Sequence, residues 1–250
     1  YQARGNAMIS PFFLICNFLF SGTMGIFADY KRFGVNKVPR NSPLMVIANH
    51  QSNLDPPIIA RSVNRRTYFL AKREIFTNPL MTAVLRMWGA HPLSRGDADL
   101  SAVRWALRKL KKQGGCITLF PEGTRSRGSM RQAQHGPANI ALRSGAVVLP
   151  VGITGTEKLG TVLRVVNPSA KIRVNIGTPF RVLDVDGERK AMLNGVTKEM
   201  MGRIAELIPE NYRGVYAEEA WTERIYTADL LTDQDYGDVT PKTHSVAKLE

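Results

Sequence analysis

Short apolar runs rich in β-branched residues alternate along this chain with segments of helical periodicity, and this alternation restricts the fold more than any other feature. Runs of this kind are typical of buried strands in a parallel sheet, with helices as the connections between them. The sequence therefore predicts an α/β fold with a largely parallel sheet flanked by helices. The predicted strands are 44–48, 68–71, 116–120, 147–151 and 172–176.

Helix boundaries can be placed between these strands. Asp55 stands before Pro56 and Pro57, which predicts a helix N-cap followed by proline in the first turn. Three further helices are predicted at about 79–88, 99–113 and 188–207. The helix at 99–113 has a basic face, which is interpreted either as an ordinary solvated surface or as a contact for a membrane or an acidic acyl-carrier protein.

The N-terminal segment carries no charged residue from Gly5 to Ala28. Polar and small residues interrupt its apolar run, whereas a spanning helix needs about 20 predominantly apolar residues. We expect an N-terminal membrane-associated helix that lies in one leaflet, as a monotopic or single N-terminal anchor at the cytoplasmic face of the membrane. The alternatives are a spanning helix, a cleaved signal peptide and a core helix. Four cations follow at the expected headgroup level: Lys31, Arg32, Lys37 and Arg40.

The net charge of +13 is unevenly distributed, because residues from Glu218 onward include eight acidic and only three basic side chains. The body of the chain is therefore strongly basic, and we expect it to bind anionic membrane lipids. Nucleic acid is not an expected partner, since the chain contains no recognisable reading module. The predicted division is a membrane-associated segment at 1–30, a main domain at 31–217 and an acidic extension at 218–250.

The first candidate site follows the predicted strand 44–48, where the chain reads Asn-His-Gln-Ser-Asn-Leu-Asp from residue 49 to 55. Functional groups gather beyond the carboxyl ends of parallel strands, so His50 lies where a catalytic base is expected. The spacing lets Asp55 contact one imidazole nitrogen and leave the other for the substrate. The two cysteines and four histidines match no zinc spacing, and we predict no metal and no cofactor.

A second candidate site follows the predicted strand 116–120, where the chain continues Pro-Glu-Gly-Thr-Arg-Ser. Gly123 permits close approach of a ligand, Thr124 offers a hydroxyl, and Arg125 offers a planar fork suited to phosphate oxygens. Lys72 and Arg95 follow two other apolar stretches. Neighbouring strand ends would then combine a His-Asp pair with several cations, as expected for deprotonating a hydroxyl on an anionic substrate.

These motifs resemble the glycerolipid acyltransferase family over roughly residues 30–180. The segments NHQSNLD at 49–55, LSRG at 93–96, FPEGTRS at 120–126 and VVLPVGITG at 147–155 are similar to its four sequence blocks, in the same order. The resemblance implies catalysis by His50 and Asp55. It also implies substrate binding by a second set of residues: Lys72, Arg95, Gly96, Glu122, Gly123, Thr124, Arg125 and Pro150.

The activity implied by the resemblance is transfer of a fatty acyl group from acyl-CoA or acyl-carrier protein to the sn-2 hydroxyl of a lysophosphatidate acceptor. The expected mechanism is direct transfer with His50 as general base and no acyl-enzyme. Alternative acceptors are glycerol 3-phosphate, another lysophospholipid or a glycolipid sugar. The sequence is also compatible with a hydrolase or a non-catalytic lipid-binding protein, and a panel of acceptors would separate these functions.

Overall fold

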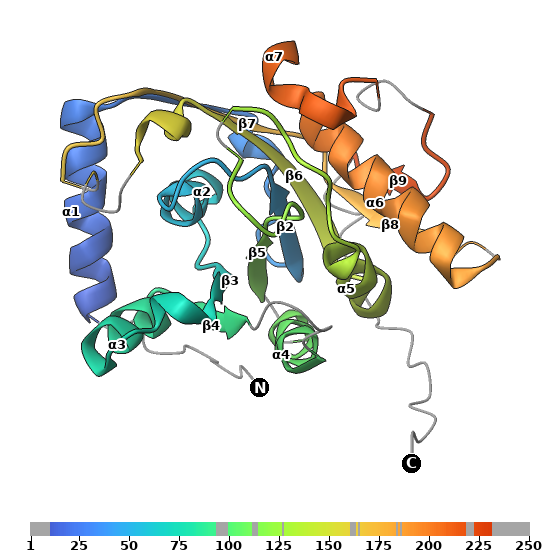
Figure 1. Cartoon of the computed structure of the whole chain (residues 1–250), viewed down its shortest axis with the longest axis horizontal. Coiled ribbons are helices and arrows are strands. Elements are labelled where there is room, and N and C mark those ends of the chain that lie inside the picture. The colour runs from blue at the N-terminus through green and yellow to red at the C-terminus, as the bar shows by residue number, and fades with distance from the viewer. Residues whose placement is uncertain are drawn as a thin grey trace.

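The computed structural model describes residues 11–93, 100–111, 115–126, 128–160, 164, 166–183, 185, 187–218 and 223–231. Arg95 and Gly96 of the predicted site lie outside the described residues, as does the acidic end of the chain after residue 231. Figure 1 shows a central sheet with helices on both sides.

The described strands form one mixed, mostly parallel sheet in the order β1-β7-β6-β2-β5-β3-β4, with β8 and β9 attached beside β6. Every predicted strand is present, whereas β1, β4, β8 and β9 were not predicted. Five of the strand pairings are parallel, and β6 pairs antiparallel with β7 and β8. The bounds are β1 (Asp29–Phe33), β2 (Leu44–Ala48), β3 (Tyr68–Lys72), β4 (Ala90–Leu93), β5 (Cys116–Leu119), β6 (Val147–Thr154), β7 (Lys171–Ile176), β8 (Phe180–Val182) and β9 (Thr227–Asp229).

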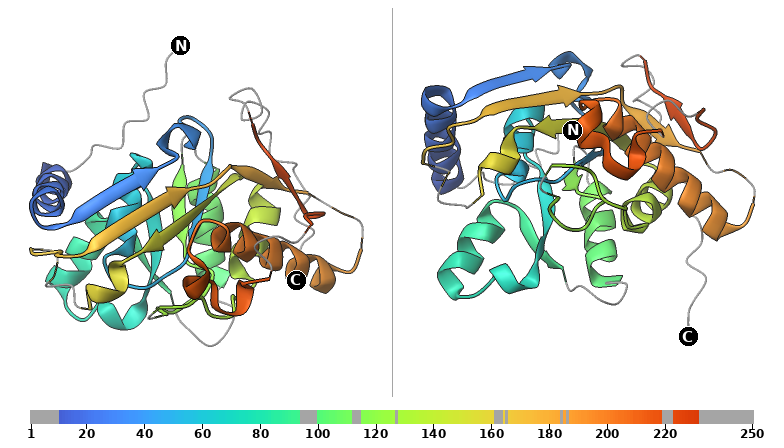
Figure 2. Two further views of the ribbon diagram at one scale, coloured as in Figure 1. Left: turned by 90° about the horizontal axis from the view of Figure 1, so that it is seen from above. Right: turned by 45° about the horizontal axis from the view of Figure 1, so that its top comes forward.

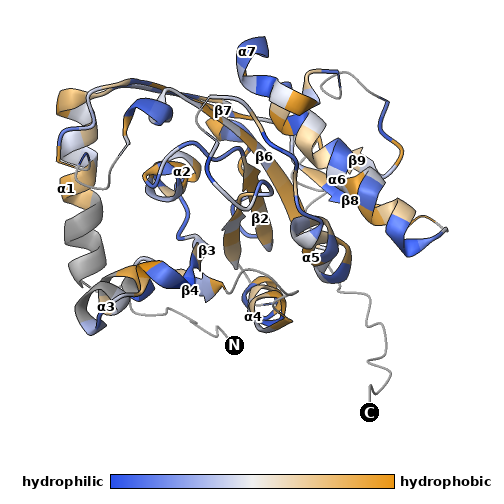
Figure 3. Ribbon diagram, in the orientation of Figure 1, coloured by the Kyte–Doolittle hydropathy of each residue, from blue (hydrophilic) through white to orange (hydrophobic). Residues whose placement is uncertain are grey.

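The α-helices divide between the two faces of this sheet (Figure 1). Met45 and Ile47 of β2 belong to a core cluster that also contains residues of α4, α5 and α6, whereas Leu44 and Val46 belong to a cluster with α1 and α2. All residues of β2 are therefore buried, and its continuous apolar sequence is explained by two covered faces. Figure 3 shows the same apolar character in β5 and β6. The bounds are α1 (Pro11–Phe27), α2 (Asp55–Val63), α3 (Pro79–Met87), α4 (Leu100–Leu110), α5 (Gly136–Ser144), α6 (Arg189–Ala205) and α7 (Glu210–Arg213).

Four short 3-10 helices complete the described elements. They are η1 (Val35–Lys37), η2 (Arg73–Ile75), η3 (Thr156–Lys158) and η5 (Gly214–Tyr216). Of these, η5 lies with the preceding α7 (Glu210–Arg213) against the loop that follows β5. Met130 N–H donates to Tyr212 O of α7, and Ala133 N–H donates to the Tyr216 hydroxyl of η5. A Cβ at Gly214 would lie 2.2 Å from Met130 O, so glycine is required for this close approach.

Helix α1 lies at the ends of β1 and β7 (Figure 2). Its Phe20 and Met24 are buried in the core, whereas Phe18 and Ile26 are 78% and 76% exposed. One face of α1 therefore packs on the domain and the other presents large apolar side chains. In the parts of the chain that the structure describes, none of the helices is both long enough and apolar enough to cross a membrane.

The structure describes residues 223–231 of the predicted acidic extension, and these residues contact the domain. Thr227–Asp229 form β9, which pairs with β8 in the main sheet, and Leu230 is buried. Arg203 on α6 contacts Asp229 and Thr227, so this acidic residue balances a buried guanidinium. The part of the extension that the structure describes is therefore integrated with the domain.

Candidate active site

The carboxyl ends of β2, β5, β3 and β4 meet at one edge of the sheet. These four strands are neighbours in this order and all of their pairings are parallel. His50 lies two residues after β2, Glu122 lies three residues after β5, and Lys72 ends β3. The described strand ends therefore lie next to one another at one edge of the sheet, and the roles of the residues on them stay predictions.

His50 and Asp55 form a directly hydrogen-bonded pair. The distance from His50 Nδ1 to Asp55 Oδ2 is 2.8 Å, and the side chains are 17% and 0% exposed, respectively. An ionised Asp55 accepts a hydrogen bond from Nδ1–H, so the neutral imidazole has its lone pair on Nε2. That nitrogen is the one suited to take a proton from a substrate.

The carboxylate of Asp55 does not cap α2, and the N-cap prediction is wrong. Leu54 is the N-cap, and it has no side-chain capping hydrogen bond. Pro56 and Pro57 have no N–H to donate, so the carboxylate instead turns back to the preceding loop. Its Oδ2 accepts the N–H groups of Gln51 at 2.6 Å and Ser52 at 2.7 Å. Asp55 therefore holds the loop of His50 as well as its ring.

Glu122 joins the loop after β5 to the loop after β2. Its Oε1 accepts the N–H of His50 at 2.9 Å, and its Oε2 accepts the N–H of Arg131 at 2.8 Å. The side chain is buried, and this burial raises the pKa of the carboxyl, although hydrogen bonds from the backbone of Arg131 and His50 and from the Ser126 side chain lower it. The acceptor-binding role implied for Glu122 stays a prediction, but the contacts of its carboxylate are with the backbone of the two loops.

Further contacts hold the loop of His50 from both sides. Asn49 exchanges two hydrogen bonds of 2.8 Å with the backbone of Ile153 in β6. The carbonyl of His50 accepts the Ser126 N–H at 2.7 Å, and its ring stacks on Phe120 with 4.1 Å between centroids. The sequence reasoning assigned no role to Asn49 or Phe120. The only signal in the sequence for such roles is position, because Asn49 directly precedes His50 and Phe120 directly precedes Pro121.

The loop after β5 exposes Gly123 and Arg125, whereas Glu122 and Ser126 are buried. Gly123 has a φ of 65°, which a residue with a side chain adopts only with strain, and this conformation reverses the chain directly after Glu122. Thr124 is half-buried and Arg125 is exposed. The guanidinium of Arg125 is thus accessible at the strand ends, as the phosphate-binding prediction requires, although its role stays a prediction.

Lys72 and Pro150 occupy different environments. Lys72 is exposed at the end of β3, and its Nζ lies 3.4 Å from Glu74 Oε1. Pro150 is buried in β6, and its carbonyl accepts the Gly177 N–H, between the partners β7 and β8. Pro150 has no N–H, so only its carbonyl contributes a hydrogen bond at this junction. Roles of both residues toward a substrate stay predictions.

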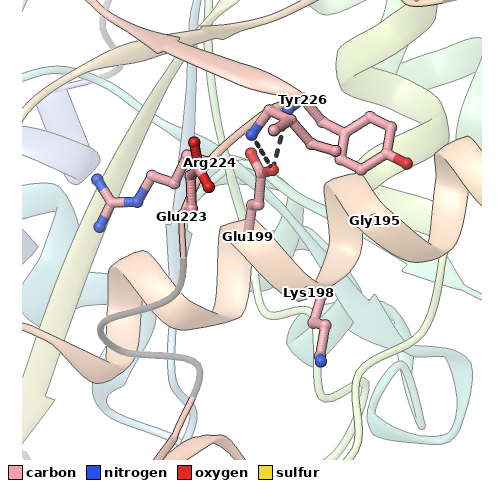
Figure 4. Close-up of a pocket in the computed structure, with 7 residues that line it drawn as sticks. Gly195, Lys198, Glu199, Glu223, Arg224 and Tyr226 are labelled. Atoms are coloured by element: carbon pink, nitrogen blue, oxygen red, sulfur yellow. Dashed lines mark hydrogen bonds between the residues drawn. The ribbon is translucent and has the colours of Figure 1, made fainter.

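A pocket lies between α6 and the segment before β9. Residues of α6 and the segment 223–226 line it, including Glu199 and Tyr226 (Figure 4). None of the predicted site residues lines this pocket. The described residues contain no group of three or more His, Cys, Asp or Glu side chains arranged to hold a metal, and the metal prediction stays a prediction.

Comparison with known proteins agrees with the site. A family model described as Acyltransferase matches residues 32–154, a span that contains His50, Asp55 and the loop after β5. The 1-acyl-sn-glycerol-3-phosphate acyltransferase of Streptococcus pneumoniae is 29% identical over 153 residues, which cover 60% of this chain and 55% of that relative. Residues 32–154 of this chain are therefore similar to an acyltransferase domain.

The acyltransferase domain is also similar to a crystal structure. The 1-acyl-sn-glycerophosphate acyltransferase of Thermotoga maritima superposes with a TM-score of 0.57 and 27% identity, over 73% of this chain and 74% of that chain. A lyso-ornithine lipid O-acyltransferase of Pseudomonas aeruginosa is 30% identical over 119 residues, which cover 47% of this chain and 45% of that relative. The chain thus spans about half the length of the curated relatives from Streptococcus pneumoniae and Pseudomonas aeruginosa.

Both coarse predictions from the sequence are therefore confirmed. The chain is related to glycerolipid acyltransferases, and its fold is a mostly parallel sheet flanked by helices.

Proposed function

We propose that this acyltransferase is a 1-acylglycerol-3-phosphate O-acyltransferase. It moves a fatty acyl group from acyl-CoA or acyl-carrier protein to the sn-2 hydroxyl of 1-acylglycerol 3-phosphate, giving phosphatidic acid in phospholipid biosynthesis. The observation that carries this proposal is the 2.8 Å contact of His50 with the fully buried Asp55, beside a loop that presents Arg125. The named relatives from Streptococcus pneumoniae and Thermotoga maritima support the same acceptor.

The proposed reaction needs one proton carrier. His50 Nε2 takes the proton of the acceptor hydroxyl as the hydroxyl oxygen attacks the thioester carbonyl carbon. The C–S bond then breaks, and the imidazolium returns the proton to the departing thiolate. Asp55 keeps the ring in the required tautomer and stabilises the imidazolium that forms between the two steps. No cofactor takes part, and the acyl donor is a substrate.

The acceptor phosphate would bind at the neighbouring strand ends. Arg125 is exposed beside the His50 loop, and Lys72 is exposed at the end of β3. Strand β4 ends at Leu93, and Arg95 and Gly96 follow it closely in the chain. We propose that they also bind the acceptor phosphate. Several charge-assisted hydrogen bonds hold a phosphate better than one, and Arg125 can donate two of them from its planar fork.

The same proposal places the enzyme on the cytoplasmic face of a membrane. Phe18 and Ile26 on the outer face of α1 would enter one leaflet, and the exposed Lys31 and Arg32 of β1 would lie among anionic headgroups. Lipid acceptor and product would then exchange with the surface on which the protein lies.

Another acceptor is the second candidate function. The similarity to a lyso-ornithine lipid O-acyltransferase favours it, because that acceptor name contains no phosphate. Labelled acyl-CoA and acyl-carrier protein should be offered with lysophosphatidate, glycerol 3-phosphate, lyso-ornithine lipid and water as acceptors. Label in phosphatidic acid is expected. Transfer to lyso-ornithine lipid alone would support the second function, and release of free fatty acid alone would indicate a hydrolase.

A further inference from the structure

Glu122 takes no part in the proton transfer, yet its carboxylate connects the two loops of the site. Its two oxygens accept the backbone N–H groups of His50 and Arg131 at 2.9 and 2.8 Å. The side chain is only 3% exposed, which leaves little of the carboxylate for a lipid substrate to contact. The residue therefore has partners suited to holding the protein in place.

We propose that Glu122 is a positioning residue that holds the backbone of His50, while Asp55 holds its ring. The inference rests on the proposed function, in which His50 is the general base. It replaces the acceptor contact that the family resemblance implies for Glu122.

The chemistry of the contacts explains why a carboxylate is needed. The two backbone partners of Glu122 are N–H donors, one to each oxygen, so both oxygens must accept. Glutamine offers one acceptor and one NH₂ group, and that NH₂ would face one of the two N–H donors. Aspartate keeps the charge, but its shorter side chain cannot reach both donors in the present backbone. Either substitution should therefore loosen one of the two loops.

The backbone of His50 is held at both of its polar groups. Glu122 binds its N–H, and Ser126 donates to its carbonyl from the backbone N–H at 2.7 Å and from the hydroxyl at 3.2 Å. The ring is held by Asp55 and by stacking on Phe120. Loss of the Glu122 contact would let the loop shift, and a displacement of about 1 Å at a reacting group can lower the rate about 10²-fold.

Glu199 on α6 provides a matched control. It is also buried, and its Oε1 accepts two backbone N–H groups, from Ile225 at 2.7 Å and Tyr226 at 2.9 Å (Figure 4). These contacts join α6 to the segment before β9, so they do not involve the loops of His50 and Arg131. Glu199→Gln removes the charge of a comparable buried carboxylate, keeps one oxygen to accept both N–H groups, and should leave the catalytic base in place.

Steady-state kinetics on Glu122→Gln, Glu122→Asp and Glu199→Gln tests the proposal. We expect kcat to fall on the order of 10²-fold in both Glu122 variants, whereas KM for lysophosphatidate changes less than about twofold. Glu199→Gln should keep the wild-type kcat. A steep rise in KM with kcat unchanged would show that Glu122 contacts the acceptor. Equal losses of kcat in the Glu199 variant would show a general effect of destabilisation.

Amide hydrogen exchange provides a measurement that does not need activity. The His50 amide should exchange slowly in the wild type and in Glu199→Gln, because it donates to a buried oxygen, and at least about tenfold faster in the Glu122 variants. Slow exchange in both Glu122 variants would overturn the proposal. If Glu122→Gln does not fold, Glu122→Asp decides. Absence of all transfer in the wild type would contradict the proposed function alone, since the exchange result would still decide whether Glu122 positions His50.

Discussion

The loops at the strand ends and the helix α1 are both at the protein surface, but they are held in different ways. The His50 loop is bonded at fixed distances to the buried carboxylates of Asp55 and Glu122. Helix α1 is held largely by burial of Phe20 and Met24, and its outer face remains apolar and exposed. Proton transfer requires a fixed geometry, whereas attachment to a lipid surface requires only apolar area and charge. The two regions should therefore respond independently to mutation.

We expect the largest difference between the effects on catalysis and on membrane binding from His50→Ala. A positioned acid or base contributes on the order of 10² to 10⁴ in rate, so acyl transfer should fall by that factor. Binding to anionic vesicles should stay close to the wild type, because His50 lies outside α1. The unfolding midpoint should fall less than in Asp55→Ala, because Asp55 Oδ2 keeps the N–H groups of Gln51 and Ser52. Kinetics and vesicle sedimentation on the same preparation measure both properties. A folded His50→Ala protein with most of its activity would remove His50 as the base.

Asp55→Ala should affect the site in two ways. The ring of His50 loses its orientation, and we expect a loss of at least about 10²-fold in kcat. The N–H groups of Gln51 and Ser52 also lose their acceptor in a buried loop, and an unsatisfied buried donor costs about 1–3 kcal/mol. Urea unfolding should therefore show a clear loss of stability, larger than that of His50→Ala. Equal stability of the two variants would contradict the bonding of Asp55 to the loop.

Substitutions on the outer face of α1 should weaken vesicle binding and leave catalysis unchanged. The double variant Phe18→Asp with Ile26→Asp should bind anionic vesicles about tenfold or more weakly, since burying one large apolar side chain is worth about 1.5–3 kcal/mol. Its kcat on detergent-dispersed acceptor should stay unchanged. Val215→Asp, which alters an exposed apolar residue of η5, is the control. If the double variant sediments with vesicles like the control at raised salt, α1 is not the binding surface.

Arg125→Ala tests whether the loop after β5 also binds the phosphate of the acceptor. Loss of a charge-assisted contact to phosphate should raise KM for lysophosphatidate about tenfold or more, because such bonds are worth about 1.5–3 kcal/mol. The KM for the acyl donor should hardly change, and discrimination against phosphate-free monoacylglycerol should decrease. Steady-state kinetics with both acceptors measures this. Equal losses on the two acceptors would mean that Arg125 does not bind phosphate and would favour the second function.

The smallest effect concerns the pH dependence of stability at Glu122. Burial raises the pKa of this carboxyl above its ordinary value of 4.5, so the folded state binds the proton more tightly than the unfolded state. The resulting stabilisation is complete below pH 4.5 and is lost as the pH rises through the raised pKa. The unfolding free energy of the wild type relative to Glu122→Gln should therefore decrease with rising pH in urea titrations. A difference that does not vary with pH would contradict the raised pKa.

The strands β2, β5 and β6 could be predicted from the sequence because each is a run of buried residues covered on both faces. Strand β7 could be predicted because buried apolar residues alternate along it. The strands β1, β8 and β9 could not, since they are short or polar and exist through pairing with β7, β6 and each other. Strand β4 contains Pro92, which argues against a central strand and is tolerated at the sheet edge. The N-cap prediction failed at Asp55 because propensity favours a capping aspartate, whereas the prolines that follow it have no N–H to be capped.

The identity of the chemical groups was determined by the sequence alone, because a histidine, an aspartate and an arginine after apolar strands carry their chemistry in their side chains. The function of Glu122 was decided only by the tertiary structure. It binds the backbone of His50, which is 72 residues away in the chain, and Asn49 likewise binds Ile153 at a separation of 104. A backbone N–H is the same in nearly every residue, so no residue type marks it as a partner. Only the parallel pairing of β2 with β5 and β6 brings these donors and acceptors within hydrogen-bonding distance.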